Sequence, residues 1–136
     1  MTTLNRRSLL SLLAVGGLAV AGCSDDSPAG ASRDLDAEQF KARAEEASAV
    51  LLDVRTPEEF AAGHIPGAIN INVEGDFASG IASLDKSAPY AVYCRSGNRS
   101  AAAMKLMDEA GFEETFHLVG GIGAWERAGF DVESQG

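Results

Sequence analysis

One cysteine lies among small polar and basic residues in the stretch YCRSGNRSA, Tyr93–Ala101. Gly97 permits the backbone angles of a tight turn. A loop that curls from a strand into a helix can aim several N–H groups at one point, where they bind an anion. Arg95 and Arg99 add two positive charges that persist at physiological pH. Because the thiolate is the reactive form of cysteine, this pattern predicts that Cys94 is a nucleophile in an anion-binding loop.

The residues that follow the cysteine are the candidate binding residues of this loop. They are Arg95, Ser96, Gly97, Asn98, Arg99 and Ser100. A cysteine can instead be a small buried hydrophobe in a plain connection, but so many basic, hydroxyl and glycine neighbours argue against that interpretation. The sequence has two histidines and no Cys-x-x-Cys pair, so it indicates no zinc or iron–sulfur site and no cofactor.

Strands and helices alternate around this loop. We expect strands at residues 50–54, 68–71, 90–94 and 115–119. Helices are expected to start after Asp36 and to cover residues 57–62, 77–84, 98–110 and 121–128. Such alternation predicts an α/β fold with a central parallel sheet and helices on both faces. Ligands of these folds bind beyond the carboxyl ends of the strands. Cys94 closes one expected strand, so it should lie at that edge.

Several helix ends are marked by the residue types that cap helices. Asp36 and Thr56 are expected caps, with Gln39 and Glu59 completing the two capping boxes. For the helix after the cysteine loop, one apolar face is expected. Its members are Ala103, Leu106, Met107 and Ala110.

The first 22 residues have the pattern of a signal peptide. Arg6 and Arg7 precede an uncharged run of 15 residues, 8–22. A membrane-spanning helix is the weaker interpretation, because about 20 mainly apolar residues are needed to cross a bilayer. The paired arginines resemble a twin-arginine export signal, but Leu9 stands where that motif usually has phenylalanine. Both the Sec and the Tat route therefore stay open.

The leader ends in Val-Ala-Gly-Cys, Val20–Cys23, which resembles the lipobox of bacterial lipoproteins. The resemblance implies that the chain is cut before Cys23 and that this cysteine is lipidated. Two or more acyl chains at this end would anchor the protein stably in the membrane. An ordinary signal peptide followed by an unrelated cysteine is the alternative. With Cys23 lipidated, Cys94 has no disulfide partner. The expected location is the cell membrane, lipid-anchored on its extracytoplasmic face.

The expected organisation is therefore a signal peptide at residues 1–22, a flexible tether at 23–33 and one folded domain at 34–133. Removing the leader takes away two arginines and leaves 9 basic and 20 acidic residues, a net charge of −11. Such a surface repels nucleic acid, which is excluded as a partner. The membrane is an expected partner only through the lipid on Cys23.

Three separated segments resemble single-domain rhodaneses, which are sulfurtransferases, over nearly all of residues 34–132. They are LLDVRTPEEFAAGHIPGAINI, YCRSGNRSA and LVGGIGAWERAGFDV, in the family's order. The resemblance implies a rhodanese-like domain whose nucleophile is Cys94. It also implies that Asp53 and Arg55 support the active loop, although a turn-stabilising ion pair explains them as well. His64 is interpreted as a turn residue, and His117 and Trp125 as core residues.

The chemistry implied by the resemblance is sulfur transfer through a persulfide. The Cys94 thiolate would take the outer sulfur of a small sulfur-containing anion such as thiosulfate and pass it to cyanide or a thiol. Arg95, with Arg99 as a second candidate, would hold the anionic end of the donor.

Two other functions stay open at this point. One is a persulfide carrier or sensor with little turnover. The other is a cysteine phosphatase or arsenate reductase. The related phosphatases have five residues between the cysteine and the phosphate-binding arginine, whereas four residues separate Cys94 from Arg99. The shorter loop favours a single sulfur atom over a tetrahedral phosphate.

Overall fold

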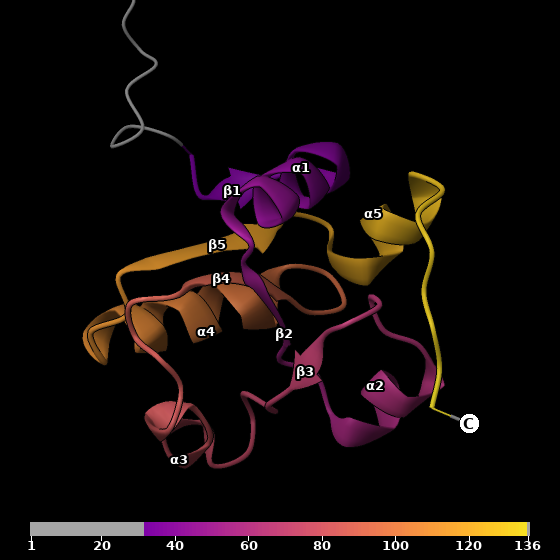
Figure 1. The fold of residues 1–136 in the computed structure, drawn as a ribbon. Coiled ribbons are helices and arrows are strands. Elements are labelled where there is room, and N and C mark those ends of the chain that lie inside the picture. The colour runs from indigo at the N-terminus through magenta and orange to yellow at the C-terminus, as the bar shows by residue number, and fades with distance from the viewer. Residues whose placement is uncertain (1–31, 136) are drawn as a thin grey trace, which may run out of the picture. The chain divides into compact units, whose positions relative to one another are not determined.

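The fold is built around one parallel sheet, shown in a computed structural model that describes residues 32–135 (Figure 1). The sheet has five strands in the order β1-β5-β4-β2-β3, and every neighbouring pair is parallel. The strands are β1 (Asp34–Leu35), β2 (Val50–Asp53), β3 (Ile69–Asn70), β4 (Pro89–Tyr93) and β5 (Glu114–Leu118). Because β4 is central and all strands run the same way, the residue after β4 lies at the middle of the carboxyl edge.

Helices cover both faces of the sheet. They are α1 (Ala37–Ala47), α2 (Pro57–Ala62), α3 (Phe77–Ala82), α4 (Asn98–Glu109) and α5 (Gly121–Arg127). Side chains of α1 and α5 share one core with the sheet, and side chains of α3 and α4 share the other. This is the predicted α/β architecture. None of the helices within residues 32–135 is both long and apolar enough to cross a membrane.

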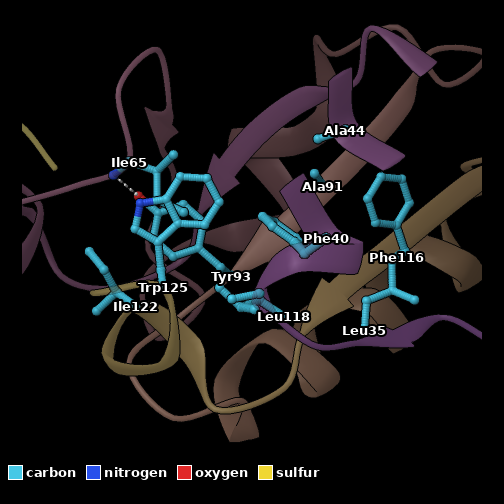
Figure 2. Packing of buried hydrophobic residues seen from close by; sticks show 11 residues of the cluster. Leu35, Phe40, Ala44, Ile65, Ala91, Tyr93, Phe116, Leu118, Ile122 and Trp125 are labelled. Atoms are coloured by element: carbon cyan, nitrogen blue, oxygen red, sulfur yellow. Dashed lines mark hydrogen bonds between the residues drawn. The ribbon is translucent and has the colours of Figure 1, made fainter. Parts of the chain in front are cut away.

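The alternation of side chains along β4 separates the two cores. Ala91 and Tyr93 point to the α1–α5 side, where Phe40 of α1 packs edge-on against Phe116 and Trp125 (Figure 2). The other core contains Tyr90, Val92 and Cys94 from the same segment, together with Phe77 of α3 and Met107 of α4. Cys94 therefore belongs by its strand register to the face that α4 covers.

The predicted caps at the starts of two helices are confirmed, whereas α3 ends at Ala82, two residues before the predicted end. Asp36 and Gln39 form a reciprocal capping box at α1, and Thr56 and Glu59 form another at α2, where Pro57 is the first helical residue. The strand expected at residues 68–71 is shorter, because only Ile69 and Asn70 pair with β2. The two-residue strand β1 was not predicted, since so short a segment carries no alternation to recognise.

One predicted helix face is partly wrong. Ala103 and Met107 of α4 are buried as expected, but Leu106 is 43% exposed and Ala110 is also exposed. The buried stripe instead runs through Ser100, Ala103, Met104 and Met107. Because Ser100 is turned inward to meet the cysteine, the helix is rotated relative to the most apolar stripe that the sequence offers.

The two ends of the described chain are held on the domain. Arg33 Nη2 pairs with Asp108 of α4 at 2.9 Å, and its Nε donates to the Thr115 carbonyl at 2.8 Å. At the other end, the Gln135 N–H donates to the Ala61 carbonyl at 2.9 Å. The expected signal peptide, the expected lipidation site at Cys23 and nearly all of the expected tether lie outside the described residues.

Candidate active site

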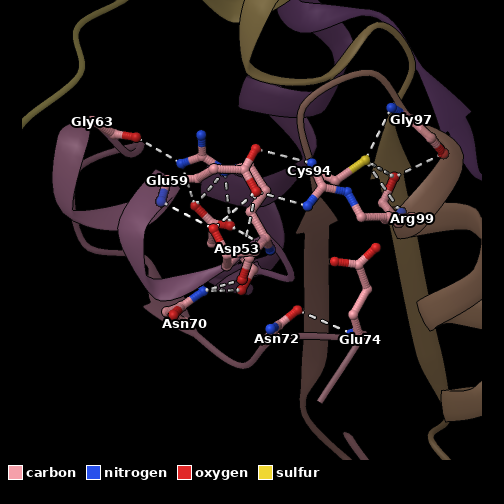
Figure 3. Close-up of polar contacts among 12 residues, drawn as sticks. Asp53, Glu59, Gly63, Asn70, Asn72, Glu74, Cys94, Gly97 and Arg99 are labelled. Atoms are coloured by element: carbon pink, nitrogen blue, oxygen red, sulfur yellow. Dashed lines mark hydrogen bonds and ion pairs between the residues drawn. The ribbon is translucent and has the colours of Figure 1, made fainter.

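Cys94 lies immediately after β4 and is fully buried. Its sulfur is the acceptor of several converging donors: the Gly97 N–H at 3.0 Å and the Ser100 N–H at 3.3 Å (Figure 3). The hydroxyl oxygen of Ser100 lies 3.6 Å from the same sulfur. Gly97 has φ +109°, a conformation that glycine adopts without strain. The loop therefore curls around the thiol as the sequence predicted.

This cradle changes the acidity of the thiol. Burial raises the pKa of Cys94, but hydrogen bonds from the Ser100 hydroxyl and from the N–H groups of Ser100, Gly97 and Ser96 outweigh it, so the pKa lies below that of an ordinary cysteine. The direction agrees with the sequence-based expectation, and so does the part played by the N–H groups of the loop. Hydrogen bonds, rather than the two nearby arginines, are the main stabilisers of the thiolate.

The loop is backed by the start of α5. The Ile122 N–H donates to the Cys94 carbonyl at 2.9 Å. Gly121 has φ +62°, and a Cβ atom at this position would lie 2.2 Å from the carbonyl carbon and oxygen of Arg95. Only a residue without a side chain allows this approach. The second glycine of LVGG thus brings α5 against the active loop.

The Arg99 guanidinium is paired with a carboxylate and does not contact the Cys94 thiol. It makes a two-pronged ion pair with Glu59, with Nη1–Oε1 at 2.7 Å and Nη2–Oε2 at 3.0 Å. The Arg99 guanidinium lowers the pKa of Glu59 to about 2. Because Glu59 occupies the Arg99 guanidinium, the anionic end of a donor would have to compete for it, and the binding role expected for Arg99 stays a prediction. Glu59 ties the start of α2 to the start of α4.

Arg95 has different surroundings. It is exposed, and it has no ion-pair or hydrogen-bond partner for its side chain among residues 32–135. It borders an open cleft of about 300 Å³. The cleft is lined by Arg55, Glu59, Ala62, Gly63, Arg95, Ile122, Glu126 and Val132. Arg95 is thus the loop cation available to an incoming anion, although Glu126 adds an opposing charge to the lining.

Asp53 and Arg55 form a buried ion pair at the end of β2. Arg55 Nη2 lies 2.6 Å from Asp53 Oδ2, and the same nitrogen donates to the Gly63 carbonyl at 2.6 Å. The guanidinium also lies over the Tyr93 ring, with 5.7 Å to the ring centre. Neither side chain contacts the sulfur of Cys94 through any hydrogen bond within the described chain. The pair joins β2, the end of α2 and β4. The support of the active loop that the resemblance implies stays a prediction.

The histidines differ from each other. His64 is buried and lies just before the turn at residues 66–67 rather than in it, because its backbone pairs with that of Glu133 in an isolated antiparallel bridge. Its ring stacks on Phe60 with ring centres 3.8 Å apart, and its Nδ1 lies 2.8 Å from the Phe60 carbonyl. His117 on β5 is also buried, but its Nδ1 lies 2.8 Å from Ser100 Oγ, the hydroxyl that contacts the cysteine sulfur. The interpretation of His117 as a core residue missed this contact.

Between residues 32 and 135, no three His, Cys, Asp or Glu side chains are grouped closely enough to hold a metal ion. The candidate site is therefore one nucleophilic thiol, its N–H cradle and an exposed arginine.

Comparison with known proteins decides the family. The profile described as "Rhodanese-like domain" matches residues 36–128. The chain belongs to the rhodanese-like family. The motif segments recognised in the sequence fall within this match, apart from the last residues of the third.

The relatives of this rhodanese-like chain include named sulfurtransferases. It is 46% identical over 76 residues to the "Putative sulfurtransferase YtwF" of Bacillus subtilis, covering 56% of this chain and 72% of that protein. It is 34% identical to the "Thiosulfate sulfurtransferase GlpE" of Shewanella oneidensis, covering 71% and 94%. Among solved structures, the rhodanese-like domain of the Anabaena protein Alr3790 superposes with a TM-score of 0.69 at 34% identity, covering 76% and 80%.

Proposed function

We propose that this domain is a sulfurtransferase that carries sulfane sulfur as a persulfide on Cys94. In the first step, the Cys94 thiolate attacks the outer sulfur of a donor such as thiosulfate. A new S–S bond forms, the donor's own S–S bond breaks, and its electron pair leaves with sulfite. In the second step, an acceptor, cyanide or a thiolate, attacks the outer sulfur of the persulfide and releases the Cys94 thiolate. This divides one transfer into two displacements at the same sulfur.

The observation that carries the proposal is the convergence of donors on one sulfur atom. The N–H groups of Gly97 and Ser100 lie 3.0 and 3.3 Å from Sγ. They stabilise negative charge on the thiolate before the attack and on the persulfide after it. The lowered pKa of Cys94 supplies more thiolate at neutral pH than an ordinary cysteine has.

Arg95 is the residue we assign to the anionic end of the donor. It is exposed at the mouth of the cleft, next in the chain to the nucleophile. A guanidinium binds an oxyanion through two N–H groups at once. Ser96 and Asn98 are exposed members of the same loop, and we assign them a secondary part in binding the donor.

The pairing of Arg99 weighs against a phosphatase or an arsenate reductase. A tetrahedral oxyanion in this loop would need a guanidinium aimed at it, and the one on Arg99 is held by both oxygens of Glu59. A carrier with little turnover remains the alternative that geometry does not address, because it would use the same cradle.

Steady-state kinetics test the proposal against both alternatives. Wild-type protein should turn over thiosulfate and cyanide and should release negligible nitrophenol from p-nitrophenyl phosphate. Cys94→Ser should abolish the transfer. Inserting one residue between Asn98 and Arg99 should favour oxyanions over sulfane sulfur. Phosphate ester hydrolysis without sulfur transfer would refute the sulfurtransferase, and persulfide formation without cyanide turnover would identify a carrier.

We also propose that the mature protein starts at a lipidated Cys23 and is held on the extracytoplasmic face of the cell membrane. Support comes from the order of charge, apolar run, small residues and cysteine in the leader. Cys23→Ala should move the protein to the soluble fraction while sulfur transfer by Cys94 persists. A disulfide between Cys23 and Cys94 would refute both assignments.

A further inference from the structure

His117 is a polar side chain in an apolar row that crosses the sheet. The register pairs Leu52 with Val92, Val92 with His117, and His117 with Asp34, so the four residues lie side by side on the face covered by α4. Leu52 and Val92 are fully buried, and His117 is 6% exposed. A buried imidazole is stable there only with partners for both ring nitrogens.

Both partners of the imidazole are present, and they connect it to the nucleophile. On one side, His117 Nδ1 lies 2.8 Å from Ser100 Oγ, and that oxygen lies 3.6 Å from Cys94 Sγ. On the other side, His117 Nε2 lies 2.8 Å from Asp34 Oδ1. The four side chains form a continuous chain of hydrogen bonds from the buried thiol to an exposed carboxylate. Of these contacts, only the one between Ser100 and Cys94 bears on the sulfur-transfer steps described above, through the acidity of the thiol.

The chain of contacts supports two protonation states equally well. With a neutral imidazole, the thiol donates to Ser100 Oγ, and Nε2–H donates to Asp34. The single Ser100 hydroxyl proton is then donated to Nδ1 at 2.8 Å rather than to the Gly97 carbonyl, which lies 3.1 Å from the same oxygen. If the thiol proton and the hydroxyl proton each move one place along the chain, the cysteine becomes a thiolate and the imidazole becomes an imidazolium. The Ser100 hydroxyl then donates to the thiolate and accepts from Nδ1–H, while Asp34 still accepts from Nε2–H. Every polar atom keeps a partner in both states.

The charges around His117 leave Asp34 as its direct counter-charge. Arg33, just before β1, is paired with Asp108 of α4 and also donates to Thr115. Arg99, at the start of α4, is paired with Glu59. The other charged residues of α4 and β5 are Lys105 and Glu109, which are exposed, and Glu114, which pairs with Arg43. The carboxylate of Asp34 is therefore the charged group in direct contact with His117.

We propose that His117, oriented by Asp34, is a positioning residue that acts through Ser100 to accept the proton of the Cys94 thiol. The thiol proton moves to Ser100 Oγ and the Ser100 hydroxyl proton moves to His117 Nδ1, with no gain or loss of atoms or electrons. Cys94 is left as a thiolate that can attack the donor. The role of this relay in turnover rests on the proposed sulfurtransferase function. The relay itself concerns only the ionisation of Cys94, so it can be tested without any sulfur donor.

The test is the pH dependence of Cys94 alkylation by iodoacetamide in wild-type protein and in His117→Asn. An asparagine amide can occupy the position of Nδ1 and keep a hydrogen bond to Ser100, but it takes up no proton. We expect the midpoint of the alkylation profile to rise by about one pH unit, so that the rate near neutrality falls about tenfold. Circular dichroism and a thermal midpoint establish that the variant is folded.

Asp34→Asn is the second arm. Its side chain is 69% exposed, so the fold should tolerate the change, and the amide oxygen still accepts from Nε2–H. The matched control is Glu46→Gln, which removes the same charge from an exposed position on α1. We expect Asp34→Asn to raise the alkylation midpoint and Glu46→Gln to leave it unchanged.

A folded His117→Asn variant with the wild-type alkylation profile overturns the proposal. If that variant does not fold, the comparison between Asp34→Asn and Glu46→Gln decides, and equal profiles overturn it. Because alkylation uses no thiosulfate, a shifted profile together with absent sulfur transfer would refute the proposed function and leave the relay standing.

Discussion

Arg55 and Arg99 each pair with one carboxylate beside the active loop, but the two pairs have different surroundings. The Asp53–Arg55 pair is buried, with side-chain exposures of 0% and 6%. The Glu59–Arg99 pair is partly open to solvent, at 27% and 23%. A buried charge that loses its partner is costly, whereas an exposed charge is hydrated instead. The buried Asp53–Arg55 pair therefore stabilises the folded structure around the site. The open Glu59–Arg99 pair fixes the orientation of the Arg99 guanidinium.

The largest expected effect is the loss of one partner from the buried pair. Asp53→Ala should lower the free energy of unfolding by about 3–5 kcal/mol, because it leaves the Arg55 guanidinium buried without a counter-charge. Urea denaturation measures the loss. The double variant Asp53→Ala/Arg55→Leu should recover part of it, since no charge is then buried alone. A loss below about 1 kcal/mol in Asp53→Ala would mean that the buried pair resembles the open one.

Arg95 extends the comparison to an arginine without any carboxylate partner in the described chain. Arg95→Ala should leave the unfolding free energy nearly unchanged. It should raise the KM for thiosulfate by about ten- to a hundredfold, because a charge-assisted hydrogen bond is worth about 1.5–3 kcal/mol. Initial rates over a range of thiosulfate concentrations give KM and kcat separately. If kcat falls and KM is constant, Arg95 acts on the nucleophile rather than on donor binding.

The contribution of the open Glu59–Arg99 pair to the free energy of unfolding should depend on pH in the acid range. Arg99 lowers the pKa of Glu59 from 4.5 to about 2. A carboxylate whose pKa is lower in the folded state contributes stability above its unfolded pKa, and that contribution is lost as the pH falls. Wild-type protein should therefore lose this part of its stability between about pH 4.5 and 2.

Glu59→Gln measures that contribution. The variant should be about 1 kcal/mol less stable at neutral pH, because the pair is partly solvated. Its unfolding free energy should depend less on pH in the acid range than that of the wild type. Urea denaturation at several pH values gives both curves. Parallel curves would show that the Glu59–Arg99 pair contributes no pH-dependent stability.

The smallest effect is expected at Glu126, the acidic residue that shares the cleft with Arg95. Glu126→Gln should lower the KM for thiosulfate by no more than about fivefold, since a surface charge contributes about 1 kcal/mol or less. The effect should shrink as ionic strength rises. An increase in KM would contradict the electrostatic account of the cleft.

The parts of the molecule that could be predicted from the sequence are those set by near neighbours. The turn at Gly97 and the caps at Asp36 and Thr56 depend on residues within a few positions of each other. The cradle around Cys94 follows from the same local geometry. Sequence patterns report such features because the interacting groups are adjacent in the chain.

The contacts that the sequence did not reveal join distant segments. Glu59 meets Arg99 across 40 positions and Asp34 meets His117 across 83. Glu59 was already explained as the third residue of a capping box, so no signal remained to indicate its ion pair. The polar His117 at a core-facing position of a strand was the available hint. Its use required the strand order, which places β1 beside β5.

The central claim is that the Cys94 sulfur accepts a sulfane sulfur, and intact-protein mass spectrometry after thiosulfate treatment tests it most directly. Wild-type protein should gain the mass of one sulfur atom on the peptide that contains Cys94, and cyanide should remove it. Cys94→Ser should gain nothing. A wild-type protein that stays unmodified, while its Cys94 is still alkylated rapidly by iodoacetamide, would contradict the claim, because the thiolate would then be reactive but not a sulfur acceptor.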